Sequence, residues 1–221
     1  MLRIISFTLN GKFTQVAVDE RASLLDLLRE QGCTSVKKGC EVGECGACTV
    51  LVDGKSVDSC LYLALWVEGR TVLTVEGLRR PDGSLHPAQV AFIEEAAVQC
   101  GFCTPGLIMA AVEIVGMAHG CKQGETIGQA EAGHGSAGCA AVVGSVGQAE
   151  AGHGCAVGAA VEGSIGNDSG QGTHGGRVFT RDELRRLISG HLCRCTGYEN
   201  ILNAVEKACQ SRLGEPYITD S

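Results

Sequence analysis

Residues 37–48 read Lys37-Lys38-Gly39-Cys40-Glu41-Val42-Gly43-Glu44-Cys45-Gly46-Ala47-Cys48, and a fourth cysteine, Cys60, follows in the next segment. The spacing C-x4-C-x2-C-x11-C is the plant-type pattern of four thiolates around a [2Fe–2S] cluster. Thiolates are soft ligands that suit such clusters. The three glycines let the loop wrap around a compact inorganic core, because glycine tolerates backbone angles that a Cβ atom forbids. We therefore predict a cluster held by Cys40, Cys45, Cys48 and Cys60.

The alternative for this loop is a structural zinc site. Zinc ligands usually come in paired C-x2–4-C knuckles. Here three of the four cysteines share one loop, and the fourth lies beyond a short hairpin. The spacing therefore favours the iron–sulfur cluster over zinc.

Length, charge and cysteine content restrict the class of protein. The 221 residues are enough for two small domains, and the net charge of −7, without basic runs, argues against nucleic acid as a partner. The 13 cysteines suit a secreted disulfide scaffold or an intracellular metalloprotein. Residues 1–10 lack the features of a secretion signal, so we expect a cytoplasmic metalloprotein. No apolar stretch of about 18 residues exists, so we expect no membrane span.

Residues 1–78 alternate short strands with one helix. Asn10-Gly11 and Asp53-Gly54 are typical hairpin turns, and Ser23 is a typical helix cap. We expect a helix from Ser23 to Glu30 and strands at 2–9, 13–18, 49–52, 55–59 and 70–75. This pattern predicts an α+β domain with the β-grasp arrangement of ferredoxins. Cys33, just before the loop, is interpreted as a small buried side chain.

From Pro81 onward the pattern is helical. A helix opens at His86-Pro87 and runs to Gln99, and Thr104 is expected to cap a second helix that reaches Met117. Thr180 to Glu183 form a capping box, and a last helix covers residues 200–210. Residues 79–115 and 177–213 are therefore expected to form a four-helix bundle.

Two further cysteine pairs lie at the helix junctions of this second domain. Cys100 and Cys103 form C-x2-C, and Cys193 and Cys195 form C-x-C. Alone, C-x-C is a weak signal, and C-x2-C is also found in zinc and redox sites. Two junctions that face each other in a bundle would nevertheless offer four thiolates. Next to the first loop, we interpret these four cysteines as the ligands of a second [2Fe–2S] cluster.

Residues 116–176 interrupt the helical domain with a glycine-rich insert. It contains 18 of the 32 glycines, and the segment from Ile127 recurs from Val146 and, in degenerate form, from Ile165, a period of 19. Such a composition is typical of a linker. We predict that the insert docks on a partner subunit or a second copy. Its cysteines and histidines are candidates for an extra metal site, namely Cys121, Cys139, Cys155, His134 and His153. The alternative is that the three cysteines are small buried thiols.

Three strings of this sequence resemble the iron–sulfur subunit of molybdenum hydroxylases, the xanthine dehydrogenase and aldehyde oxidoreductase family. They are residues 36–60, residues 99–109 and residues 192–198. The resemblance covers 1–115 and 177–210 and fills all eight ligand positions in order. Within this family, the first cysteine loop and the residues that follow it are most similar to the small subunits of bacterial xanthine dehydrogenases.

This resemblance implies a division of labour between subunits. A large partner binds molybdopterin and hydroxylates the substrate, and a medium subunit, when present, binds FAD. Electrons would pass from molybdenum to the cluster of the helical domain, then to the ferredoxin-like cluster and on to FAD. The resemblance also places Gln99 and Cys195 near the pterin.

Other functions remain open at this stage. The chain is also compatible with the small subunit of an aldehyde or heterocycle oxidoreductase of the same family. A free ferredoxin-type carrier is a second class, although a carrier does not need the helical domain. A structural zinc protein is a third. Iron content and co-purifying subunits would separate these functions.

Overall fold

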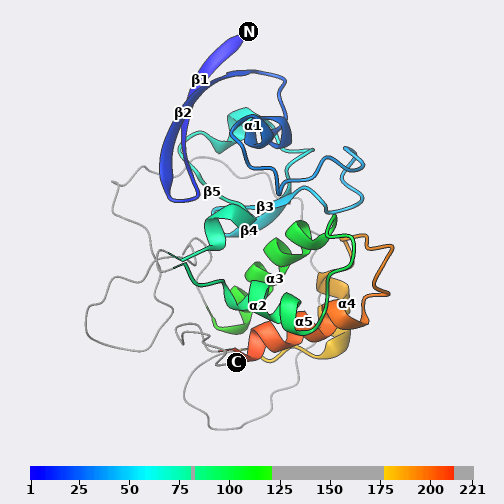
Figure 1. The fold of residues 1–221 in the computed structure, drawn as a ribbon. Coiled ribbons are helices and arrows are strands. Elements are labelled where there is room, and N and C mark those ends of the chain that lie inside the picture. Colours follow the sequence, from blue (N-terminus) through cyan, green and yellow to red (C-terminus); the bar gives the residue numbers. More distant parts are fainter. Residues whose placement is uncertain (81–82, 121–176, 212–221) are drawn as a thin grey trace, which may run out of the picture.

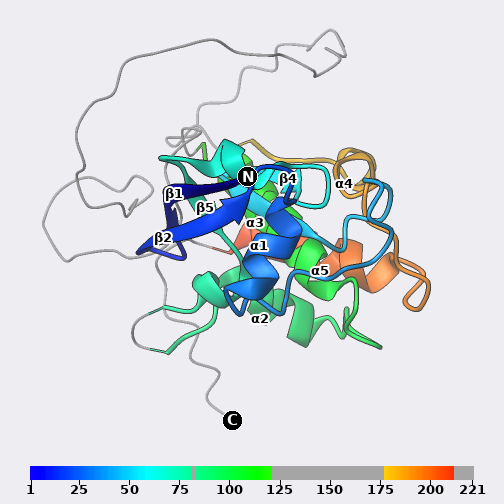
Figure 2. The same ribbon diagram turned by 90° about the horizontal axis from the view of Figure 1, so that it is seen from above.

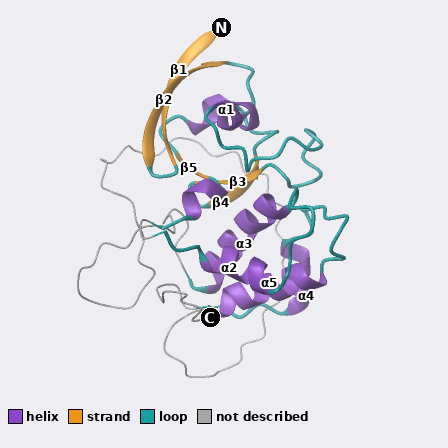
Figure 3. Ribbon diagram, in the orientation of Figure 1, coloured by secondary structure: helices purple, strands orange, loops and turns teal. Residues whose placement is uncertain are grey.

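The computed structural model describes residues 1–80, 83–120 and 177–211, which are coloured in Figure 1. The described chain is mixed α and β, with a sheet in the N-terminal half and helices in the C-terminal half, as expected (Figure 3). The predictions for the repeats of the insert, and for its cysteines and histidines, fall on 121–176 and lie outside the described residues.

A five-stranded mixed sheet forms the core of the N-terminal half. The strand order is β2-β1-β5-β3-β4, in which β1 and β5 are parallel and the other neighbours are antiparallel. The strands are β1 (Leu2–Leu9), β2 (Lys12–Asp19), β3 (Thr49–Val52), β4 (Lys55–Asp58) and β5 (Thr71–Leu73). Figure 2 looks from the N-terminal end onto β1, β2 and α1 (Leu24–Glu30).

The two predicted hairpin turns are confirmed. Asn10-Gly11 and Asp53-Gly54 all have positive φ, the backbone conformation that a two-residue turn of the I′ type requires. The predicted strand at 70–75 is too long, because β5 ends at Leu73 and a 3-10 turn, Val75–Leu78, follows. That turn leads into the connection to the helical half.

Helix α1 packs its leucines against the sheet. Ser23 Oγ accepts a hydrogen bond from the Asp26 N–H at 3.1 Å, which confirms the predicted cap. Leu24, Leu28 and Val50 are fully buried in this core. Cys33 is buried in the same cluster, as predicted for a small core side chain.

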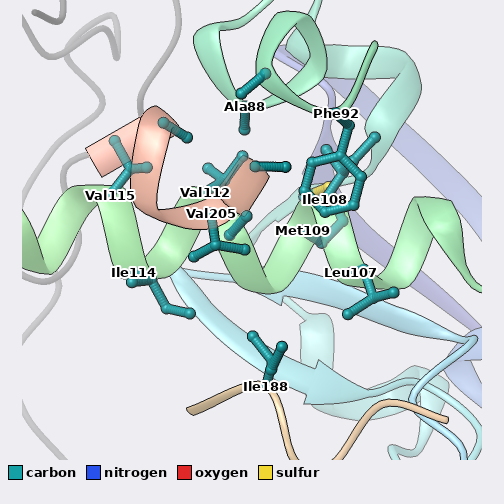
Figure 4. Packing of buried hydrophobic residues seen from close by; sticks show 14 of the residues in the cluster. Ala88, Phe92, Leu107, Ile108, Met109, Val112, Ile114, Val115, Ile188 and Val205 are labelled. Carbon is teal, nitrogen blue, oxygen red and sulfur yellow. The ribbon is translucent and has the colours of Figure 1, made fainter. Parts of the chain in front are cut away.

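The C-terminal half contains four described helices around one core. They are α2 (Pro87–Glu94), α3 (Thr104–Ala118), α4 (Arg181–Leu187) and α5 (Glu199–Gln210). Helix α3 runs through the centre, between α5 and the sheet, and Figure 4 shows its side chains meeting those of the neighbouring helices. Leu107, Val112 and Val115 are fully buried there. The central helix therefore ties the helical core to strand β3.

Two predicted helix limits are wrong. Helix α2 ends at Glu94 rather than Gln99, because Ala96 takes a left-handed conformation that no helix continues through. Thr104 is the first helical residue of α3, and the cap position belongs to Cys103, which makes no side-chain cap bond. The last helix, predicted from about residue 200, runs from Glu199 to Gln210 as expected. The Thr180 capping box on α4 is confirmed.

Helix α2 begins at an unusual cap, a buried histidine. His86 Nδ1 accepts a hydrogen bond from the Ala88 N–H at 3.1 Å, and Gln89 Oε1 accepts one from the His86 N–H at 2.9 Å. Burial lowers the pKa of His86 to about 4, and the charge of Arg80 acts in the same direction. The neutral ring is therefore the form that caps the helix.

Among the described helices, none has the length and apolar character needed to cross a membrane.

We predict that His86 makes the stability of the protein depend on pH. In the unfolded chain the pKa returns to about 6.5, so the unfolded state binds more protons than the folded state between that value and about 4. The contribution of His86 to the free energy of unfolding is complete above pH 6.5 and is lost as the pH falls toward 4. Between pH 7 and pH 5 the free energy of unfolding should fall by about 2 kcal/mol through this group.

The measurement is chemical denaturation of the wild type and of His86→Asn at both pH values. Asparagine also caps helices but does not titrate, so the variant should lose less stability on acidification. An equal loss in both proteins would contradict the assignment.

Candidate metal centres

The first predicted cysteine set lies at one end of the sheet. Cys40, Cys45 and Cys48 come from the loop between α1 and β3, and Cys60 follows β4. The loop takes left-handed conformations at several positions, which curl its backbone around its own cysteines. As a result, backbone N–H groups point inward at sulfur.

Backbone donors favour the thiolate of Cys40. The N–H groups of Val42 and Glu44 point at Cys40 Sγ, at 3.5 and 3.3 Å. These N–H groups, with the neighbouring Cys45 thiol, lower the pKa of Cys40 to about 7. Hydrogen bonds of this kind to cluster sulfur also raise the reduction potential of a bound centre.

Cys48 and Cys60 form a second, more buried pair. Burial raises the pKa of Cys48 to about 11, although a backbone hydrogen bond from Cys60 opposes the shift. Asp58 Oδ1 lies 3.9 Å from Cys48 Sγ and adds negative charge. Such a thiol ionises only when a cation binds to it, so the pair suits a metal.

The second predicted set is brought together from two distant junctions. Cys100 and Cys103 lie between α2 and α3, and Cys193 and Cys195 lie between α4 and α5. Cys195 Sγ and Cys100 Sγ are 3.6 Å apart. Burial raises the pKa of Cys103 to about 12, and Cys193 beside it acts in the same direction. The predicted meeting of the two junctions is therefore present in the structure.

The cysteines of both sets meet in pairs. Among the described residues, no three His, Cys, Asp or Glu side chains converge as ligands of a single ion. Two thiolates on one tetrahedral ion, with metal–sulfur bonds of about 2.3 Å, lie about 3.8 Å apart. A disulfide bond is about 2.05 Å. The 3.6 Å of Cys100 and Cys195 fits two ligands of one metal, and two such pairs fit the two irons of a [2Fe–2S] centre.

Tyr198 supports the second set, a role that the sequence pattern did not indicate. Its backbone is left-handed, with φ of 69°, at the start of α5. The Tyr198 hydroxyl accepts a hydrogen bond from the Cys193 N–H at 2.7 Å and donates one to the His191 carbonyl at 3.0 Å. The only signal in the sequence was its place at the end of the 192–198 string.

Thr196 acts on the sulfur itself. Burial raises the pKa of Cys193, but hydrogen bonds from the Thr196 hydroxyl and N–H outweigh it, so the pKa lies below its usual value. Thr196 Oγ1 and Cys193 Sγ are 3.2 Å apart. Cys193 is thus held in a form suited to a metal.

The sequence pattern did not indicate His191 as a site residue either. It is buried between the two cysteine sets, and burial lowers its pKa although the negative charge of Asp58 opposes the shift. Leu192, the next residue, donates its N–H to the Cys45 carbonyl at 3.0 Å. A lone histidine before a C-x-C pair carries no spacing signal, so only the fold identifies its position.

Gln99, which directly precedes Cys100, is exposed. Cys100 and Cys195 are exposed as well, in contrast to the buried Cys103. Two apolar side chains near them, Phe102 and Leu192, are 47% and 59% exposed. One side of the second set is therefore open to the surface of this chain.

Comparisons with known proteins find relatives of both halves of the chain. The family model for a 2Fe-2S iron-sulfur cluster binding domain matches residues 7–72, and that for a [2Fe-2S] binding domain matches residues 74–141. The quinoline 2-oxidoreductase structure from Pseudomonas putida 86 superimposes with a TM-score of 0.65 at 32% identity. It covers 95% of this chain and 94% of the matched chain.

Two curated relatives extend over nearly the whole chain. The xanthine dehydrogenase iron-sulfur-binding subunit of Escherichia coli O157:H7 is 39% identical over 201 residues, 91% of each protein. The nicotine 6-hydroxylase small subunit of Paenarthrobacter nicotinovorans is 36% identical over 202 residues, 91% of this chain and 86% of that subunit. The chain therefore belongs to the family of [2Fe–2S] subunits of xanthine dehydrogenase and related molybdenum hydroxylases.

Proposed function

We propose that this chain is the electron-transfer subunit of a xanthine dehydrogenase-like molybdenum hydroxylase. It transforms no substrate itself. Electrons released at the molybdopterin centre of a partner subunit pass through two [2Fe–2S] clusters in this chain to FAD or another acceptor. The relatives, which are iron–sulfur-binding or small subunits of oxidoreductases, support this function.

We further propose the ligands of each cluster. The observation that carries this assignment is the pairing of the cysteines, because each iron of a [2Fe–2S] cluster takes two protein ligands. The first cluster would be held by Cys40, Cys45, Cys48 and Cys60. The second would be held by Cys100, Cys103, Cys193 and Cys195.

When bound, each cluster accepts and releases one electron at a time. The chain's own residues tune this property. The N–H groups of Val42 and Glu44 stabilise negative charge at Cys40, and Thr196 does so at Cys193. Burial of Cys48 and Cys103 keeps water away from one side of each centre.

We infer the docking surfaces of the partners from the exposed residues beside each cysteine set. The second set opens to the surface at Cys100 and Cys195, next to Gln99, so we propose that the molybdopterin-binding large subunit docks there. Around the first set, Val42 and Leu61 are exposed apolar side chains. We assign that side to the FAD-binding medium subunit.

The domain division is part of the same proposal. Residues 1–78 form the ferredoxin-like β-grasp domain, and 79–115 with 177–213 form the four-helix bundle. The insert, 116–176, docks on a partner and is not required for the clusters. In support, the Arg177 N–H donates to the Ala118 carbonyl at 2.8 Å. The described residues on either side of 121–176 are therefore in contact.

The alternative function is a free ferredoxin-type carrier, which has no fixed enzyme partner. The second thiolate set argues against it, because a carrier needs one centre only. The substrate of the complex, whether a purine, an aldehyde or another heterocycle, belongs to the large subunit.

Cluster content tests the ligand assignment. We predict four iron and four acid-labile sulfide per chain, two of each per cluster, and two distinct EPR signals after reduction. Cys45→Ser should lose half of the iron and one signal. Cys33→Ala is the matched control, since Cys33 is buried but outside both sets, and it should keep all four iron. Zinc in place of iron, or equal loss in both variants, would refute the assignment.

Electron flow tests the function. In the holoenzyme with Cys103→Ser, substrate should still reduce the molybdenum of the partner subunit in a single turnover. Reduction of the final acceptor should be lost, because the cluster of the helical domain is the first to receive electrons from molybdenum. Near-normal acceptor reduction would contradict the electron-transfer function. Purification of the native chain without a molybdopterin protein would favour the free carrier instead.

Excision tests the insert. Replacing residues 120–175 by a short Gly/Ser link should leave the iron content unchanged, because Arg177 already contacts Ala118 at the end of α3 and a shorter loop costs little entropy. Association with the large subunit, measured by size-exclusion chromatography, should weaken. Loss of iron with normal association would show that the insert serves the clusters.

A further inference from the structure

The two cysteine-bearing loops touch through their backbones. The Leu192 N–H donates to the Cys45 carbonyl at 3.0 Å. Cys45 belongs to the first ligand set, and Leu192 directly precedes Cys193 of the second. The two sets are therefore joined by peptide groups, and no long side chain separates them.

A second hydrogen-bonded connection runs beside the first. His191 Nε2 lies 3.1 Å from Thr49 Oγ1. Thr49 Oγ1 lies 2.8 Å from the Gly46 carbonyl and 3.3 Å from Asp58 Oδ1. The carbonyl and the carboxylate are acceptors only, so the single hydroxyl proton goes to one of them. His191 Nε2–H must therefore donate to Thr49, which assigns the tautomer of the ring.

The ring is also held by its surroundings. His191 is 8% exposed, and among the described residues its Nδ1 has no hydrogen-bond partner. In the assigned tautomer Nδ1 carries only a lone pair, so no buried N–H is left unsatisfied. The Nε2 bond to Thr49 is thus the one polar contact of the imidazole in the described chain.

Gly46 leaves no space between the loops. A Cβ atom on Gly46 would lie 2.6 Å from His191 Cδ2 and 2.7 Å from the Gly190 carbonyl oxygen. A Cβ atom on Gly106 of α3 would overlap the Gly46 carbonyl oxygen. The peptide at Gly46 therefore packs closely against both α3 and the 190–192 segment.

We propose that His191 is a positioning residue that locks the two cluster-binding loops together and so fixes the separation of the two clusters. The proposal rests on the ligand assignment above. Electron transfer and magnetic coupling between two centres both fall steeply with distance. A small shift of the 190–192 segment relative to Gly46 therefore alters both, while each cluster keeps its own four ligands.

A contact elsewhere between the same two halves provides a matched control. Glu113 of α3 accepts hydrogen bonds from the Ser56 N–H, at 3.1 Å, and from the Ser56 hydroxyl. This contact is exposed and involves neither ligand loop. Its loss removes a connection between the halves without touching Gly46 or the 190–192 segment.

The experiment is EPR of the fully reduced holoenzyme, with iron content measured on each variant. The wild type should show splitting of the cluster signals by spin–spin interaction. His191→Ala should keep four iron per chain and lose or narrow this splitting. His191→Gln should restore it, because the glutamine amide can donate to Thr49 as Nε2–H does. Glu113→Ala, which removes the acceptor oxygens of this contact, should leave it unchanged.

Substitutions of Thr49, the hydrogen-bond partner of His191, give an independent readout. Thr49→Val removes the acceptor and should reduce the splitting as His191→Ala does, whereas Thr49→Ser keeps the hydroxyl and should preserve it. Unchanged splitting in His191→Ala with full iron, or loss of a cluster in both His191→Ala and Thr49→Val, would overturn the positioning function. Failure of the ligand assignment would be recognised separately, because the wild type itself would then not show two cluster signals.

Discussion

Burial of thiolate charge is the constraint on which both loops depend. Cys48 and Cys103 are buried, and their pKa values are raised to about 11 and about 12. Without a cation these thiols stay protonated near neutral pH. Bound metal supplies the missing positive charge, so formation of the loops and binding of the clusters are linked. The backbone donors at Cys40 and the hydroxyl at Cys193 supplement this positive charge.

The two halves of the structure are connected because their cysteine-bearing loops meet at the Gly46 peptide. Helix α3 approaches it closely at Gly106, and so does the 190–192 segment. Helix α3 also packs on β3, which directly follows the first loop. The sheet, the central helix and the second loop therefore hold each other in place, and the relative position of the cysteine sets follows from backbone packing.

Local signals in the sequence predict most of the elements. Asn10-Gly11 and Asp53-Gly54 have the turn chemistry that sets hairpin register, and the capping box at Thr180 marks the start of α4. The end of α2 was missed because nothing in its composition marks the left-handed Ala96. Both cysteine sets follow from spacing, yet their pairing and the positions of His191 and Tyr198 do not. Those features depend on contacts between residues far apart in sequence. The role of Gln99 stays a prediction.

The central claim is that the paired cysteines hold two binuclear iron centres. Mössbauer spectroscopy of the oxidised protein, enriched in the Mössbauer-active isotope of iron, tests it most directly. The account predicts that all iron occurs as diamagnetic, spin-coupled ferric pairs in tetrahedral sulfur coordination, divided equally between two sites. Magnetically isolated ferric iron, or the averaged valence of a [4Fe–4S] cluster, would contradict it.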